Sequence, residues 1–263
     1  MVKGIQKTSQ ISKIFISKYS VIAFFLTLLF FFSSLLKTES YAVATRHHLA
    51  TDIGMKVLEE GGNAIDAAVA VAFALAVVNP SAGNLGGGGF MLLHLAETNE
   101  TLSLDYRERA PLKSSERMFQ DDSGKVIKGL SLNSILASGV PGTVSGMFYA
   151  SEKFGTMNIK TLINPSINLA RKGFVLSAFQ AKNLNKYKQK FSKDKEAKKI
   201  FTRPNGFYEG DILIQKNLAR TLERIAKNGK EEFYEGYTAK RIANFFKNNG
   251  GILSLQDLNQ YEL

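Results

Sequence analysis

The sequence predicts an α+β fold, and three observations carry that prediction. Residues 64–78 read as an almost wholly apolar helix, residues 90–95 and 101–106 as two short strands, and the second half has apolar residues at helical spacing. The roughly 220 residues that follow residue 42 can enclose a substantial core, as one domain or as part of a larger one.

The first 42 residues have the pattern of a secretory signal peptide or an uncleaved membrane anchor. Several lysines precede an apolar stretch over residues 21–36, and residues 40–44 place small side chains at the spacing of a cleavage site. The apolar stretch is shorter than the about 20 residues that span a bilayer, which favours cleavage. Because the positive residues stay cytoplasmic, we expect residues 43–263 to be exported, to a bacterial periplasm or outside the cell.

Charge and composition exclude several kinds of site. The net charge is +11, and without the leader 29 basic and 22 acidic side chains remain, a net charge of +7. Much of the excess lies in residues 182–199, where eight lysines accompany only two acidic residues. Aromatic residues are too sparse there for a nucleic-acid site, so the run is interpreted as a solvated helix face. The chain has no cysteine, which excludes disulfides, thiolate zinc sites and a cysteine nucleophile.

Two helices are predicted near the start of the mature chain. Helical spacing over residues 49–60 ends at Gly61 and Gly62, since glycine accepts the left-handed conformation that terminates helices. Asn63 can cap the helix over residues 64–78, which is apolar on nearly every face and therefore buried. Pro80 ends it, because a residue before proline is pushed out of helical conformation.

A glycine run, residues 86–89, joins that helix to the predicted hairpin. Its spacing matches neither a dinucleotide fingerprint nor a phosphate loop. Consecutive glycines instead allow a backbone to approach another backbone or a small ligand closely. Tight packing between helix and strand, without any ligand, is the other interpretation.

Arg107 follows directly where the second predicted strand ends. A guanidinium group there can hold a substrate carboxylate through two hydrogen bonds. Taken alone, an arginine beside Asp105, Glu108 and Arg109 more often belongs to a surface ion-pair group. The order of buried helix, glycine run, hairpin and arginine favours the substrate-binding interpretation, with Asp105 and Glu108 able to hold the guanidinium in place.

The second half is predicted to be largely helical. Helices are expected over residues 143–153, over 159–172 with an interruption near Pro165, over 215–228 and over 239–248. A long helix is expected to begin after Ser177, which has capping-box spacing to Gln180. Ser254 has the same spacing to Asp257 and can cap a short final helix.

Several separated motifs resemble those of the gamma-glutamyltranspeptidases, also called glutathione hydrolases, in the N-terminal-nucleophile hydrolase superfamily. The motifs are Val43-Ala44-Thr45 with His47 and Leu49-Ala50, Gly61-Gly62-Asn63-Ala64-Ile65-Asp66-Ala67-Ala68, Asn79-Pro80 with the glycine run, Asp105-Tyr106-Arg107-Glu108 with Ala110-Pro111, Gly139-Val140-Pro141-Gly142-Thr143-Val144, and residues 250–258. The resemblance extends over essentially all of residues 43–263. It implies a four-layer αββα sandwich, of which this chain holds only the large-subunit part.

The resemblance also implies a chemistry. Arg107 corresponds to the arginine that binds the α-carboxylate of the gamma-glutamyl group of substrates such as glutathione. The family's nucleophile is a threonine that opens a small subunit, and this chain stops before that point. We therefore expect no catalytic residue, metal or cofactor within the chain, a small subunit as its partner, and no turnover by the chain alone.

Other candidate nucleophiles and ligands are weaker. Cleavage after Ala44 would leave Thr45 as an N-terminal threonine, but the resemblance places it at the start of the large subunit. Ser145 lacks the first glycine of a nucleophile-elbow motif and is interpreted as a residue at a helix start. The chain's histidines, His47, His48 and His94, have no metal-binding spacing.

Two other functions also fit the sequence. A cephalosporin or glutaryl acylase would use the same fold on aliphatic diacid side chains, although residues 105–108 favour gamma-glutamyl substrates. The chain could also be a nonenzymatic product of a disrupted gene.

Overall fold

The computed structural model describes residues 24, 27 and 41–263. The chain divides into two compact units, residues 1–42 and 43–263, and every helix and strand with described bounds lies in the second. The predicted signal peptide or anchor lies almost wholly outside the described residues. No helix formed by the described residues has the length and apolarity needed to cross a bilayer.

Two of the predicted helices form the start of the core. Helix α2 spans His48–Glu59 and helix α3 spans Ala64–Val78, with the bounds expected for α3. Asn63 caps α3: its side chain accepts hydrogen bonds from the backbone of Ile65 and Asp66, while Asp66 accepts one from the backbone of Asn63. This reciprocal capping box fixes where α3 begins. Most of the helix is buried, as its composition predicted.

A β-hairpin follows the glycine run. Strand β1, Phe90–Leu95, pairs antiparallel with strand β2, Glu100–Asp105, so that Phe90 lies opposite Asp105. Backbone hydrogen bonds between Gly89 and Tyr106 extend the pairing by one residue at the Arg107 end. Leu93 is buried, whereas Phe90 and Leu92 lie on the outer face, 65% and 75% exposed. The hairpin therefore has one covered apolar face and one open one.

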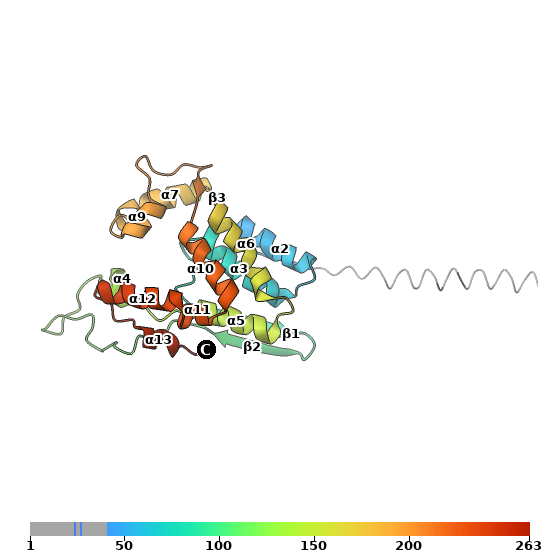
Figure 1. Cartoon of the computed structure of the whole chain (residues 1–263), viewed down its shortest axis with the longest axis horizontal. Helices are drawn as coiled ribbons and strands as arrows, with labels where there is room; N and C mark the ends of the chain where they lie inside the picture. The colour runs from blue at the N-terminus through green and yellow to red at the C-terminus, as the bar shows by residue number, and fades with distance from the viewer. Residues whose placement is uncertain (1–23, 25–26, 28–40) are drawn as a thin grey trace, which may run out of the picture. The chain divides into compact units, whose positions relative to one another are not determined.

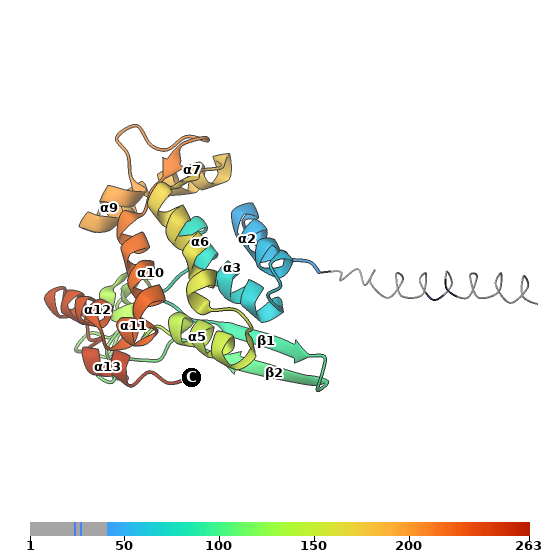
Figure 2. The ribbon, with the colours of Figure 1, turned by 45° about the vertical axis from the view of Figure 1, so that its right-hand side comes forward.

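Three more helices continue the core that begins at α3. Helix α5, Thr143–Phe154, helix α6, Ile159–Lys172, and helix α10, Lys216–Asn228, bury Val144, Leu162 and Leu222 completely. Figure 1 labels these helices, and the turned view of Figure 2 shows α6 between α3 and α10. The predicted interruption of α6 at Pro165 was wrong: the helix runs through it, because both neighbouring turns are buried against other helices and outweigh the lost backbone bond.

The long helix predicted after Ser177 was also wrong. Three short helices stand in its place: α7, Ala178–Lys186, α8, Lys188–Phe191, and α9, Lys195–Phe201. The capping box at Ser177 and Gln180 is present, so the predicted start is confirmed. Asp194 opens α9 by accepting a hydrogen bond from the backbone of Ala197, and the chain changes direction before it. Strand β3, Phe174–Val175, pairs with β4, Ile212–Leu213, on either side of this excursion.

Shorter helices complete the described chain. They are α4, Leu130–Asn133, the 3₁₀ helix η1, Ile135–Ala137, α11, Glu231–Tyr234, α12, Tyr237–Asn248, and α13, Leu255–Asn259. Ser254 and Asp257 form the predicted capping box at α13. Asp257 also accepts a hydrogen bond of 2.5 Å from the backbone of Leu112, which ties the end of the chain to the segment after Arg107.

Candidate functional site

Arg107 lies two residues beyond the end of β2, and its side chain is 60% exposed. Its backbone N–H donates to Oδ1 of Asp105 at 2.9 Å, which turns the chain at the strand end. Its Nε donates to Oε2 of Glu108 at 3.2 Å, and its guanidinium carbon lies 5.7 Å from the centre of the Phe90 ring. Among the described residues its two terminal amino groups make no hydrogen bond, so they are available to a carboxylate.

Glycines hold the backbone of residues 106–108 in place. A Cβ atom on Gly88 would lie 2.3 Å from the carbonyl oxygen of Tyr106, and one on Gly142 would lie 2.2 Å from the same atom. The carbonyl of Gly87 accepts hydrogen bonds from the backbone of Gly142 and Thr143, at 2.8 and 3.0 Å. The prediction that the glycine run permits close backbone approach is confirmed, and its target is the segment that carries Arg107.

Tyr261, near the end of the chain, supports the same segment. Its hydroxyl donates to the carbonyl oxygen of Arg107 at 2.9 Å. Its ring stacks on Tyr234, with centroids 5.6 Å apart and planes 15° from parallel, and the Arg109 guanidinium lies 5.7 Å from its centre. Sequence reasoning missed both tyrosines, because their contacts join segments far apart in the chain and no motif marked them.

The tyrosines at this site are neutral donors rather than bases. Burial raises the pKa of Tyr106 and, strongly, that of Tyr234. Burial also raises the pKa of Tyr261, where the Arg109 charge opposes the shift and the nearby carboxylates reinforce it. Tyr234 donates to the carbonyl of Pro141 at 3.0 Å and accepts from the backbone of Ser145 at 3.1 Å. Tyr261 thus holds the backbone of Arg107 directly, and Tyr234 stacks on Tyr261.

The structure offers no nucleophile beside Arg107 among the other sequence candidates. Ser145 is buried in the first turn of α5, as expected for a residue at a helix start. The Thr45 hydroxyl is engaged locally, with the carbonyl of His47 at 2.8 Å and the hydroxyl of Thr51 at 2.9 Å. No group of three or more histidine or acidic side chains that could hold a metal ion occurs among the residues with described positions.

A family model described as gamma-glutamyltranspeptidase matches residues 50–263. The chain belongs to the gamma-glutamyltranspeptidase family. The match covers every element described above except the start of α2, and it includes the glycine run, Arg107 and Tyr261.

Two glutathione hydrolase proenzymes are similar in sequence to most of this chain. It is 48% identical over 226 residues to the glutathione hydrolase proenzyme of Pseudomonas sp. (strain A14), and 45% identical over 222 residues to that of Escherichia coli (strain K12). These alignments cover 85% and 84% of this chain but only 39% and 38% of the relatives. The chain thus spans well under half the length of these relatives.

Solved structures confirm the predicted α+β fold of the N-terminal-nucleophile hydrolase type. The gamma-glutamyltranspeptidase of Helicobacter pylori matches with a TM-score of 0.83 and 47% identity, over 86% of this chain and 65% of that one. The enzyme of Pseudomonas nitroreducens, complexed with L-DON, matches with a TM-score of 0.80 and 38% identity, over 86% and 66%. A cephalosporin acylase from Bacillus halodurans, at 24% identity and a TM-score of 0.68, shares the fold.

Proposed function

We propose that this chain is the large-subunit part of a gamma-glutamyltransferase that acts on glutathione and related gamma-glutamyl compounds. The observation that carries the proposal is the Arg107 guanidinium, exposed at the strand end with its terminal amino groups unoccupied among the described residues. The family membership of residues 50–263 supports it.

Arg107 is the substrate-binding residue in this proposal. Its Nε donates to Glu108, its guanidinium lies over the Phe90 ring, and the backbone beneath it is packed against Gly88. Such support lowers the entropy lost when the two remaining amino groups grip the substrate α-carboxylate. Arg107 then orients the gamma-glutamyl group without taking part in bond breaking.

The bond-breaking group comes from a small subunit led by a threonine. Its hydroxyl oxygen attacks the gamma-carbonyl carbon, the amide C–N bond breaks, and the hydroxyl proton passes by way of the threonine amine to the departing nitrogen. The resulting ester is opened by water or by the amine of an acceptor amino acid, which restores the threonine. Nothing in this sequence needs a metal or an organic cofactor.

The open face of the β1–β2 hairpin is a surface on which a segment of the small subunit can pack. Phe90 and Leu92 project from a two-stranded sheet, and both outer edges of that sheet lack a paired strand within residues 41–263. Isolated two-stranded sheets are marginal in water, and exposed edges invite further strands. We propose that strands of the small subunit cover this face and carry the threonine toward Arg107.

The chain alone is proposed to have no turnover, and the complete protein to act outside the cytoplasm after cleavage of residues 1–42. Of the two rivals, no observation beyond the shared fold favours a cephalosporin or glutaryl acylase. The other rival, a nonenzymatic remnant of a disrupted gene, is tested by thermal denaturation. Stabilisation by glutamate that is lost in Arg107→Ala would indicate a retained binding protein. A chain that does not fold would indicate a decayed gene product.

The test is a chimera. Residues 43–263 replace the matching region of the Pseudomonas sp. (strain A14) proenzyme, and hydrolysis of a gamma-glutamyl anilide is followed for the chimera and for the isolated chain. We expect turnover by the chimera and none by the chain. Steady hydrolysis by the isolated chain would contradict the proposal, as would a folded, processed chimera that hydrolyses glutaryl anilide and leaves the gamma-glutamyl anilide untouched.

A further inference from the structure

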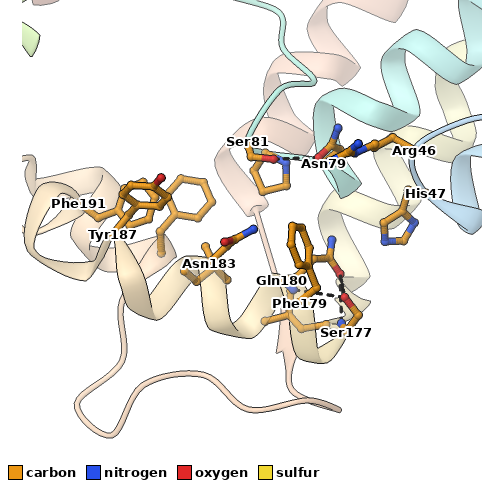
Figure 3. Close-up of a pocket in the computed structure, with 14 residues that line it drawn as sticks. Arg46, His47, Asn79, Ser81, Ser177, Phe179, Gln180, Asn183, Tyr187 and Phe191 are labelled. Atoms are coloured by element: carbon orange, nitrogen blue, oxygen red, sulfur yellow. Dashed lines mark hydrogen bonds between the residues drawn. The ribbon is translucent and has the colours of Figure 1, made fainter. Parts of the chain in front are cut away.

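A cavity of about 400 Å³ lies where α7–α9 meet the end of α3 and the segment before α2 (Figure 3). Its lining comprises Arg46, His47, Asn79, Pro80, Ser81, Leu176, Ser177, Phe179, Gln180, Asn183, Leu184, Tyr187, Phe191 and Phe201. Figures 1 and 2 place α7 and the β1–β2 hairpin on opposite sides of the folded unit of residues 43–263, with α3 and α6 between them. The cavity is therefore separate from the proposed Arg107 site.

One end of the cavity offers hydrogen-bond donors to an anion. Arg46 makes no ion pair and no hydrogen bond within the part of the chain that the structure describes, and it points toward Asn79 in Figure 3. The Asn79 side-chain oxygen already accepts a hydrogen bond from the Ser81 hydroxyl at 3.0 Å, which leaves its amide N–H groups free. A guanidinium and an amide without acceptors suit a carboxylate.

The charges around this end favour an anion as well. None of the residues that line the cavity is acidic. Glu209 lies in an adjoining hollow that shares Arg46 and His47, but it forms no ion pair with Arg46. Burial and the neighbouring His48 hold the pKa of His47 below its usual value, although Gln180 opposes the shift, so His47 is uncharged at neutral pH. The unneutralised charge in the cavity is that of Arg46.

The other end is apolar. The Phe191 and Phe201 rings lie 5.2 Å apart between centroids, and Leu184 is buried beside them in the same lining. In Figure 3, Phe191 and Tyr187 lie across the cavity from Arg46 and Asn79. The volume is within the range of small-molecule sites, which combine mostly apolar walls with a few placed polar groups.

We propose that this cavity binds a small amphipathic carboxylate, with its carboxylate on Arg46 and Asn79 and its apolar or aromatic group against Phe191 and Phe201. The distribution of groups distinguishes this ligand from a gamma-glutamyl compound. Such a compound carries a second charged group, an ammonium, for which the cavity has no acidic partner. The proposal is independent of the function assigned to Arg107.

The experiment is a calorimetric titration of the full chain with 3-phenylpropionate at neutral pH, alongside the uncharged analogue 3-phenylpropanol. We expect one binding site per chain, and affinity for the alcohol lower by about tenfold or more, because charge-assisted hydrogen bonds are lost. Arg46→Gln should weaken 3-phenylpropionate binding by about the same factor and leave the alcohol unaffected. Arg117→Gln, which removes an exposed arginine outside this lining, is the matched control and should change neither affinity.

Three results would overturn the proposal: no binding of 3-phenylpropionate, equal affinity for acid and alcohol, or an Arg46→Gln variant that binds as well as Arg117→Gln. If 3-phenylpropionate does not bind, the cavity is better explained as a packing site for polypeptide from the rest of the protein. Both variants change exposed side chains, and circular dichroism checks that each remains folded. Since the titration needs neither turnover nor Arg107, its failure leaves the proposed gamma-glutamyl transfer untouched.

Discussion

The Tyr261 hydroxyl donates a hydrogen bond of 2.9 Å to the backbone carbonyl of Arg107, across 154 positions of sequence. The same tyrosine stacks on Tyr234 and lies beneath the Arg109 guanidinium. The end of the chain therefore fixes the backbone on which the proposed substrate-binding side chain stands. This contact gives the tail of the described chain a role in the site as well as in packing.

Tyr261→Phe removes this hydrogen bond and keeps the aromatic stack. We expect a loss of about 1 kcal/mol in the free energy of unfolding, the usual net value of one hydrogen bond. Urea denaturation measures it, with Tyr208→Phe as control, because Tyr208 is 65% exposed and its hydroxyl makes no hydrogen bond among the described residues. Equal losses in the two variants would remove the case for a supporting role of Tyr261.

Gly88→Ala tests the close approach of the glycine run to the Arg107 segment. The new Cβ would lie 2.3 Å from the carbonyl oxygen of Tyr106, so the backbones must separate. We expect a cost of about 1–3 kcal/mol or more in unfolding free energy, as for other overpacked sites. Gly86→Ala, where a Cβ would meet nothing within 4 Å, should cost far less. A Gly88→Ala chain as stable as Gly86→Ala would contradict the close approach.

Local signals in the sequence predicted most of the elements. The cap at Asn63, the apolar run behind it and the short apolar run of β1 each act within a few residues, and the structure reproduces the bounds of α3 and β1. Pro165 and the excursion after Ser177 were misjudged because burial of α6 and the cap at Asp194 override what the local pattern favours.

The candidate site was predicted in part. The position of Arg107 after a strand and beside glycines could be inferred from order along the chain. The contacts of Tyr261 and Tyr234 could not, since a tyrosine at either position carries no local pattern and its partner is set by tertiary packing alone. The same holds for the cavity at Arg46, whose lining comes from three separate segments.

Asp66 provides a pH-dependent test of the core. Its side chain is fully buried and accepts hydrogen bonds from the backbone of Asn63, Thr156 and Met157 and from the Thr156 hydroxyl. Burial raises its pKa, but these hydrogen bonds outweigh burial and hold the pKa below the ordinary value of 3.8. A carboxyl whose pKa is lower folded than unfolded stabilises the fold above the unfolded value, and this contribution disappears as the pH falls through the folded pKa.

Asp66→Asn should therefore lower the free energy of unfolding at pH 7 by about 2–3 kcal/mol, since charged hydrogen bonds are replaced and one N–H group faces donors. The difference from the native chain should shrink as the pH is lowered below 3.8. Denaturation with urea at pH 7 and at acid pH measures both, and Asp52→Asn, at an exposed position of α2, is the control. A difference that stays constant across this pH range would refute the linkage.

The Arg107 prediction concerns binding rather than bond breaking. In the chimera, Arg107→Gln should raise KM for the gamma-glutamyl anilide by about 10- to 100-fold, with a smaller change in kcat. The factor is the contribution that hydrogen bonds to a charged group make to binding. Arg107→Lys keeps the charge but loses the two-pronged geometry, so its KM should be intermediate. Arg117→Gln is the matched control, because it removes a positive charge from another exposed side chain.

The decisive comparison uses a second substrate, the 4-aminobutyryl anilide, which lacks the α-carboxylate. If Arg107 binds that carboxylate, the native chimera should strongly prefer the gamma-glutamyl anilide, whereas Arg107→Gln should treat the two substrates nearly alike. A merely structural arginine would lower activity on both substrates equally and leave the preference intact. Full discrimination by Arg107→Gln would mean that another group reads the α-carboxylate, even if overall activity had fallen.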